Sequence, residues 1–222
     1  MDNSSLDSFF LHKDRNDFPS PASAGDDGIL AIGSNLNVDT LLKAYRLGIF
    51  PWYNEGDPIC WHHPDPRFVL FPEKIKVSHS MRNVLHKNIF KFSIDKDLPL
   101  VIRNCRMAKR NGEAGTWITD KIENAYANLF KEGFVHSAEA WQNNELVGGL
   151  YGVLIGKVFF GESMFANKSN ASKFAFIKMV EMLQKNGIEL IDCQVYTPHL
   201  QSLGAEFISR NNFVSLLKKL IP

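Results

Sequence analysis

Apolar residues recur at helical spacing between Asn37 and Leu47, where Leu41, Leu42 and Tyr45 would share one face of a helix. Asn37 is a suitable N-cap for this helix, because its short side chain can accept a hydrogen bond from the first turn. The same pattern of caps and apolar faces predicts further helices, which begin near Ser78 or Ser80, run from Thr119 or Asp120 to about Lys131, and cover residues 171–186 and 212–220.

The pattern changes to the two-residue period of β-strands after residue 134. Hairpin turns are predicted at Asn143-Asn144 and Ile155-Gly156. The predicted strands are residues 135–142, 145–154, 157–165 and, after the apolar helix, 188–195. Helices, an antiparallel run of strands, a buried helix, another strand and a final helix predict a mixed α/β (α+β) fold.

Two stretches lack regular periodicity. Residues 1–27 are polar and interrupted by proline and glycine, which indicates an extended arm. Residues 50–67 combine aromatics with prolines that remove amide donors, so this segment is predicted to be a shaped loop and not a helix. We place a domain boundary near residue 70, which divides the chain into a small N-terminal domain, 1–70, and a larger C-terminal domain, 71–222.

Composition narrows the class of protein. The chain has 222 residues and is 45% hydrophobic, enough to fill a globular core. Its net charge of +1 provides no field that attracts a polyanion, so any nucleic-acid contact must be local. The start of the chain does not resemble a secretory signal, and no segment has the roughly twenty apolar residues of a membrane span. We therefore expect a cytosolic protein whose three cysteines are reduced and buried.

A carboxylate in apolar surroundings is the first candidate for chemistry. Glu162 lies among aromatic and thioether side chains in residues 159–165. Further along, strand alternation would put Asp192 and Gln194 on one face, where the carboxylate could orient the amide. The residues alone leave open a second interpretation, in which Asp192 and Gln194 only bond to neighbouring backbone.

Two other segments could contact a nucleic acid. The aromatic loop at 50–67 is either a hydrophobic clasp between domains or a stacking surface for a base. The basic run at 74–91 is either a solvated face or a phosphate-binding surface. Its best candidates for phosphate contact are Lys74, Lys76, Arg82 and Lys87.

Eight short motifs, in one order from about residue 18 to 215, resemble the leucyl/phenylalanyl-tRNA–protein transferases of bacteria. These motifs are Gly48-Ile49-Phe50-Pro51-Trp52, Pro64-Asp65-Pro66-Arg67, Gly115-Thr116-Trp117-Ile118-Thr119, Gly148-Gly149-Leu150-Tyr151-Gly152, Gly161-Glu162-Ser163-Met164-Phe165, Asn170-Ala171-Ser172-Lys173, Ile191-Asp192-Cys193-Gln194-Val195 and Ser202-Leu203-Gly204-Ala205.

The resemblance implies an aminoacyltransferase that moves Leu or Phe, and less well Met, from aminoacyl-tRNA to proteins beginning with Arg or Lys. The product would be marked for the N-degron pathway. The family's C-terminal domain resembles the GNAT acyltransferase fold, and the absence of a pyrophosphate-cradling loop here fits the use of tRNA in place of acyl-coenzyme A. We expect a monomer without a cofactor. We also expect no metal site, because Cys60, His62 and His63 do not have the spacing of a common metal site.

The resemblance also implies roles for individual residues. In the family, the positions of Asp192 and Gln194 are proposed to draw a proton from the acceptor amine. We prefer Gln194 as an orienting group, since a neutral amide is a poor base. Glu162 is assigned to bind the Arg or Lys end of the acceptor, with Lys173 as the alternative internal partner. The donor side-chain pocket is assigned to Leu150, Phe159, Met164, Phe176, Met179 and Ile191, and the terminal adenosine to Trp52 and Trp117.

The chain departs from the family pattern at several of these positions. Leu150 and Met179 replace the more familiar Met and Phe, which affects the expected preference between Leu and Phe. His79, Asn83 and His86 stand where basic residues are expected, so the field toward the acceptor stem is weaker. Two other functions stay open: an N-acetyltransferase using acetyl-coenzyme A, and a non-catalytic RNA-binding module.

Overall fold

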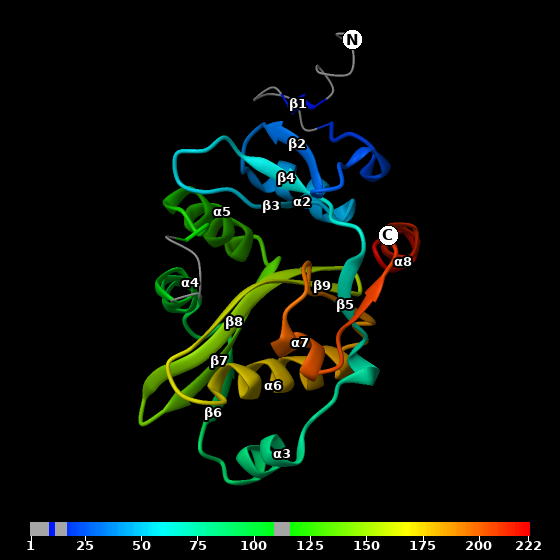
Figure 1. Cartoon of the computed structure of the whole chain (residues 1–222). Coiled ribbons are helices and arrows are strands. Elements are labelled where there is room, and N and C mark those ends of the chain that lie inside the picture. The colour runs from blue at the N-terminus through cyan, green and yellow to red at the C-terminus, as the bar shows by residue number, and fades with distance from the viewer. Residues whose placement is uncertain (1–8, 12–16, 109–115) are drawn as a thin grey trace.

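The computed structural model describes residues 9–11, 17–108 and 116–222, and its strands form a four-stranded and a seven-stranded sheet (Figure 1). The smaller sheet has the order β1-β2-β4-β3. In it, β1 is parallel to β2 and the other neighbours are antiparallel. Its elements are β1 (Phe10–Leu11), β2 (Ile29–Gly33), β3 (Phe50–Pro51) and β4 (Cys60–His62), with helix α2 (Val38–Arg46) between β2 and β3.

The larger sheet has the order β11-β5-β10-β9-β8-β7-β6. All its neighbours are antiparallel except β9 and β10, which run parallel. Its strands are β5 (Arg67–Leu70), β6 (Lys91–Ile94), β7 (Val135–Gln142), β8 (Glu145–Ile155), β9 (Val158–Ala166), β10 (Leu190–Asp192) and β11 (Glu206–Ile208).

The remaining helices surround this sheet (Figure 1). Helix α6 packs on one face, whereas α2, α4, α5 and α8 contribute to the apolar cluster on the other. Their bounds are α3 (His79–His86), α4 (Leu98–Met107), α5 (Asp120–Lys131), α6 (Ala171–Lys185), α7 (Pro198–Ser202) and α8 (Arg210–Leu220), with 3-10 turns at Pro21–Ser23 and Pro72–Lys74. Among the described residues, no helix is long and apolar enough to cross a membrane.

Strand alternation separates two apolar cores. Phe159 of β9 points into the core beneath α6, and the next residue, Phe160, points into the opposite core. There Phe160 meets Tyr45 of α2, with ring centroids 5.1 Å apart. The small sheet, α2 and one face of the large sheet therefore share a single core.

The mixed α/β prediction is confirmed, and so are most predicted helices and strands. Asn37 caps α2 by accepting the amide of Thr40 at 2.8 Å, and Thr119 caps α5. The predicted strand at 188–195 is wrong in extent, since β10 ends at Asp192. The aromatic loop contains short strands that the sequence analysis missed, because each has only a few residues between its prolines.

Sheet membership changes between His62 and Arg67, slightly before the predicted domain boundary. The division at residue 70 stays a prediction, because Tyr45 and Phe160 lie in one core. Much of the predicted N-terminal arm lies outside the described residues. Within the described part, Phe18 packs edge-on against Trp61 at 4.8 Å, so the arm is anchored there.

Candidate active site

The candidate site lies where two neighbouring strands part. Strands β9 and β10 pair from Leu190 opposite Val158 to Asp192 opposite Phe160. Beyond that point β9 continues, whereas the chain after β10 stays with β5, as Cys193 donates its amide to the Phe68 carbonyl at 2.9 Å. The resulting gap forms a pocket of about 520 Å³, a size typical of small-molecule sites.

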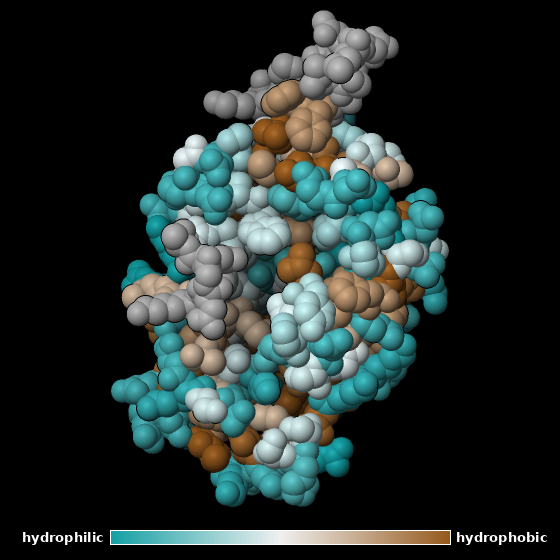
Figure 2. Space-filling view, in the orientation of Figure 1, coloured by the Kyte–Doolittle hydropathy of each residue, from teal (hydrophilic) through white to brown (hydrophobic). Residues whose placement is uncertain are grey.

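The pocket has a polar and an apolar side. Both segments beyond the last strand pair contribute, with Glu162 from β9 and Gln194 from the loop after β10. Figure 2 shows a hollow near the middle of the molecular face, with apolar residues beside its opening. A ligand in this pocket would contact charged, amide and aliphatic groups together.

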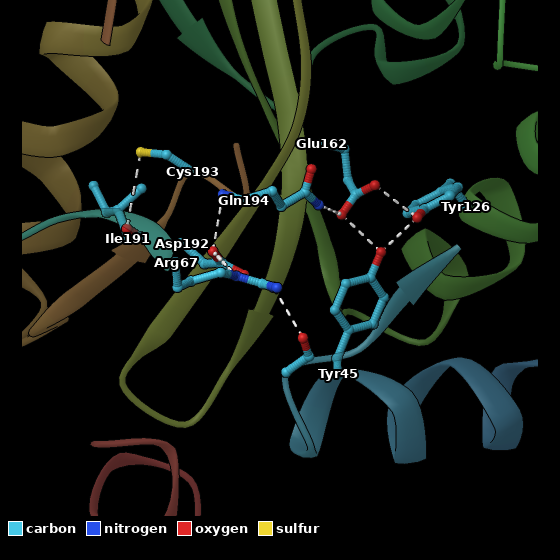
Figure 3. Close-up of polar contacts among 9 residues, drawn as sticks. Tyr45, Arg67, Tyr126, Glu162, Ile191, Asp192, Cys193 and Gln194 are labelled. Atoms are coloured by element: carbon cyan, nitrogen blue, oxygen red, sulfur yellow. Dashed lines mark hydrogen bonds and ion pairs between the residues drawn. The ribbon is translucent and has the colours of Figure 1, made fainter. Parts of the chain in front are cut away.

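Glu162 is held by groups from three separate elements (Figure 3). The Tyr45 hydroxyl of α2 donates to Oε1 at 2.7 Å, and the Tyr126 hydroxyl of α5 donates to Oε2 at 2.7 Å. The Gln194 side-chain amide donates to Oε1 at 3.2 Å. The two tyrosine hydroxyls are also hydrogen-bonded to each other. The carboxyl group is therefore neither unpaired nor bonded to Lys173, the internal partner weighed from the sequence.

Burial controls the ionisation of this cluster. Burial raises the pKa of Glu162 to about 7, while hydrogen bonds from Tyr45 and Tyr126 act in the opposite direction. Burial also raises the pKa values of both tyrosines well above their ordinary value. The tyrosines remain neutral donors near pH 7, and Glu162 can exchange a proton there.

A buried ion pair positions the other half of the polar side. Arg67 donates to both carboxylate oxygens of Asp192, at 2.8 and 2.6 Å, and both side chains are fully buried. The guanidinium lies between the rings of Phe50 and Phe213, with its carbon 4.9 and 4.6 Å from their centroids. This bidentate geometry and the two rings fix Asp192 in one orientation.

Arg67 also connects this ion pair to helix α2. It donates to the Gly48 carbonyl at 2.9 Å, just after the helix that carries Tyr45. Gly48 has φ of 75°, and a Cβ there would lie 2.5 Å from the Phe213 ring, so only glycine fits. The position of Tyr45 is thereby tied to Arg67 through the backbone.

The relation between Asp192 and Gln194 differs from the sequence prediction. Asp192 accepts the backbone amide of Gln194 at 2.9 Å, not its side chain. Gln194 lies after the end of β10 and has φ of 62°, so strand alternation does not apply to it. The backbone turn directs the Gln194 side chain toward Glu162 (Figure 3). Asp192 thus orients Gln194 through the main chain.

The apolar side contains part of the predicted donor pocket. Leu150, Met164, Phe176 and Ile191 line the cavity. Phe159 and Met179 do not line it, and both are buried in the core beneath α6. Phe159 lies opposite Ile191 in the paired part of β9, before the strands separate, and Met179 lies a turn beyond Phe176. The structure therefore moves these two residues from the pocket to its supporting core.

Both predicted adenosine-binding residues reach the pocket. Trp52 and Trp117 line it, and the Trp52 side chain is 40% exposed. His62 packs beside Trp52, with centroids 5.6 Å apart, and bonds to its carbonyl. The aromatic loop therefore contributes both to packing and to the pocket wall.

The pocket does not contain an activated thiol. Cys193 lines it, but burial raises the pKa of its thiol, so the sulfur is protonated near pH 7. Within the ranges that the structure describes, no group of three or more His, Cys, Asp or Glu side chains could hold a metal ion.

The predicted phosphate-binding residues lie outside the pocket. Lys74 is paired with Glu206 at 2.6 Å on the surface. Arg82 belongs to α3, which Figure 1 shows at the end of the molecule opposite the small sheet, and Lys87 caps that helix. A phosphate role for these residues requires a ligand much longer than the pocket.

Sequence reasoning missed the roles of Tyr45, Tyr126 and Arg67 in this site. Tyr45 was predicted only as part of an apolar helix face, and Tyr126 is likewise a buried residue of helix α5. Their phenol groups were the available signal, since a buried tyrosine hydroxyl usually finds a polar partner. Arg67 was placed in the aromatic loop, where its full burial could not be predicted.

Comparison with solved structures gives weak similarities. A GCN5-related N-acetyltransferase from Kribbella flavida matches at 8% identity and a TM-score of 0.42, covering 76% of this chain and 60% of that one. The L-PGS structure from Bacillus licheniformis matches at 12% identity and a TM-score of 0.42, covering 86% and 66%. Similarity at this level carries no argument about function.

Comparison with protein sequences is decisive for the family. Residues 69–218 match the leucyl/phenylalanyl-tRNA protein transferase model, and residues 34–65 match the model for its N-terminal domain. A leucyl/phenylalanyl-tRNA–protein transferase from Syntrophobacter fumaroxidans is 51% identical, covering 92% of this chain and 88% of the relative. Another from Flavobacterium johnsoniae is 50% identical, covering 95% and 99%. The chain therefore belongs to the leucyl/phenylalanyl-tRNA–protein transferase family.

Proposed function

We propose that this protein transfers Leu or Phe, and less well Met, from aminoacyl-tRNA to the amino terminus of proteins that begin with Arg or Lys. A single observation carries the proposal: one pocket joins an aliphatic side, two tryptophans and the Glu162–Gln194 pair. An aminoacyl ester needs an apolar surface for its side chain and aromatic rings for its adenosine, and an attacking amine needs polar groups such as the Glu162–Gln194 pair. We further propose that the protein is a cytoplasmic monomer and that its products are marked for N-degron degradation.

The donor amino acid is assigned to the apolar side. Met164 and Leu150 are flexible aliphatic groups that can accept either a branched or an aromatic side chain. The terminal adenosine of the tRNA is assigned to Trp52 and Trp117, because bases stack on aromatic rings. These contacts would hold the ester carbonyl between the two sides of the pocket.

The acceptor is assigned to the polar side. Of the residues that the structure describes, Glu162 and Asp192 are the two carboxyl residues that line the pocket. Asp192 is neutralised by Arg67, whereas Glu162 is bonded to tyrosine hydroxyls and, within the described part of the chain, has no cation paired with it. Once ionised, it would favour a cationic acceptor terminus over a neutral or acidic one. Gln194 is placed to hydrogen-bond the amine and hold it against the ester.

The reaction does not require a covalent enzyme intermediate. The ester is already activated, so amine attack on the carbonyl and departure of the ribose oxygen suffice. This agrees with the protonated thiol of Cys193. Catalysis by this pocket would consist of orientation and proton transfer.

The test is transfer of label from Leu-tRNA to a protein with an N-terminal Arg, against the same protein with an N-terminal Glu. We expect label in the Arg protein only. A parallel reaction with labelled acetyl-coenzyme A tests the acetyltransferase alternative, and binding without transfer from either donor would favour the RNA-binding alternative. Absence of label in the Arg protein would refute the proposed function.

A further inference from the structure

The hydrogen bonds around Glu162 form a closed ring. Tyr45 and Tyr126 each bond to a different carboxyl oxygen, and their hydroxyls bond to each other. An ionised Glu162 accepts one proton from each tyrosine, and the contact between the hydroxyls then has no proton to share. A protonated Glu162 can donate to the hydroxyl of one tyrosine. That hydroxyl then donates to the other tyrosine, whose hydroxyl donates to the second oxygen of Glu162. Only the protonated form uses all three contacts.

Resting on the proposed function, we propose that Glu162 takes the proton from the attacking acceptor amine, and that Tyr45 and Tyr126 hold its carboxyl group in both protonation states. Glu162 is only 8% exposed but lines the pocket, so it can meet a bound amine while remaining largely shielded from bulk water. Its place is fixed by α2, α5 and the loop after β10.

The step balances without a further reactant. A neutral amine forms the new C–N bond at the ester carbonyl, and one N–H proton passes to the ionised carboxyl group. The bond from the carbonyl carbon to the ribose oxygen then breaks, and Glu162 returns the proton to that oxygen. The products are an amide and a tRNA hydroxyl, and Glu162 is ionised again for the next cycle.

Other groups around the pocket are less suited to this role. Asp192 is fully buried, and its oxygens already accept hydrogen bonds from Arg67 and the Gln194 amide. Gln194 is a neutral amide, and the tyrosines keep their protons because burial raises their pKa values. The ring of Tyr151 on β8 packs against that of Tyr126, with centroids 5.5 Å apart, and both belong to the same apolar cluster, so Tyr151 is assigned to packing.

The principal rival is His199, which also lines the pocket. Burial lowers the pKa of its imidazole, so it is neutral near pH 7 and could accept a proton. The two candidates predict different pH profiles. Deprotonation of Glu162 gives a rise in rate centred near pH 7, whereas deprotonation of the His199 imidazolium gives a rise in rate centred below pH 6.5.

The first experiment measures single-turnover transfer from saturating Leu-tRNA to an Arg-starting peptide between pH 5.5 and 9. Glu162→Gln keeps the shape of the side chain but cannot accept the proton. We expect its rate at saturation to fall about 100-fold or more, the usual contribution of a general base, in addition to the rise in acceptor KM that follows from losing the charge that attracts the acceptor. The variant should also lose the inflection near pH 7 and retain only that of the peptide amine.

A second set of variants tests the ring independently of Glu162 itself. Hydrogen bonds from the tyrosines lower the pKa of Glu162, so Tyr45→Phe and Tyr126→Phe should each move the rate inflection to higher pH. Tyr53→Phe, a buried tyrosine outside the pocket, is the matched control and should leave the profile unchanged. This shift would not result from a general loss of stability, and it decides the question if Glu162→Gln fails to fold.

A Glu162→Gln enzyme with the wild-type saturated rate would overturn the proposal, as would one in which only acceptor KM rises. Loss of the inflection in His199→Asn, with its retention in Glu162→Gln, would transfer the role to His199. These outcomes all require transfer by the wild-type protein. If the wild-type protein transfers nothing, the proposed function fails, and the result is distinct from each of these.

Discussion

Replacing Asp192 with Asn would leave the Arg67 guanidinium as a buried cation without a counter-ion. Both side chains are fully buried, and the closest contact between them is 2.6 Å. Removing one partner of a buried ion pair costs about 3–5 kcal/mol, because the remaining charge stays away from water. For a chain of this size, that loss corresponds to a fall in melting temperature of roughly 6–20 °C.

An exposed ion pair provides the matched control. Lys157 and Glu189 also lie 2.6 Å apart, but their side chains are 57% and 43% exposed. Since water and salt screen this pair, Glu189→Gln should leave the melting temperature almost unchanged. Thermal and urea unfolding of both variants at pH 7.5 would then compare the same contact distance in buried and exposed surroundings.

A double variant separates stability from positioning. Arg67→Met with Asp192→Leu removes both charges and should recover most of the lost stability, because no buried charge remains unpaired. It should not recover transfer, since the Gln194 amide and the Gly48 carbonyl lose their partners. If Asp192→Asn and Glu189→Gln lost equal stability, or if the double variant were as unstable as Asp192→Asn, the reasoning from burial would be refuted.

Three further predictions concern binding and pH. Trp117→Ala should weaken binding of an aminoacyl-adenosine by about 1–3 kcal/mol in calorimetry, and equal affinity would limit Trp117 to packing. Arg82→Gln and Lys87→Gln should each lower the salt dependence of tRNA binding by about one unit of log–log slope, and an unchanged slope would contradict phosphate contact. Burial raises the pKa of Glu162 from 4.5 to about 7, so the stability of the folded state falls as pH rises through this range. In urea unfolding, Glu162→Gln should therefore match the wild type at pH 4.5 and gain up to about 3 kcal/mol at pH 8; a gain that does not change with pH would contradict this.

The sequence was most informative where local chemistry decides the structure. Asn37 and Thr119 mark helix starts because their side chains satisfy free backbone amides; Asn37 was predicted as a cap, and Thr119 was one of the two residues predicted to start its helix. The hairpins were predicted because alternation and turn residues agree within a few positions. Glu162 was recognised as a candidate because a carboxyl group among aromatic residues is unusual.

The remaining features depend on long-range packing. Tyr45 and Tyr126 are 81 residues apart, and neither position shows from its own surroundings that the other is near. Gln194 was assigned to a strand face because the sequence does not show that β10 ends before it. Its positive φ is a feature of the folded chain, in which Asp192 accepts the Gln194 backbone amide. Phe159 was assigned to the pocket from the resemblance to the family, and the sequence does not show that β9 and β10 are still paired at this residue.

Arg67 explains how the acid–base properties of Glu162 can be controlled from outside the pocket. The charge of Asp192 raises the pKa of Glu162 and that of Arg67 lowers it, so the two partners act in opposite directions, and burial is the largest influence. The same guanidinium holds Gly48 at the end of α2 and, through Asp192, the backbone of Gln194. Two of the donors to Glu162, Tyr45 and Gln194, are therefore located by one residue that does not line the pocket. Substitutions around Arg67 should change the pH dependence of transfer as well as its rate, even though they remove no group that touches the substrates.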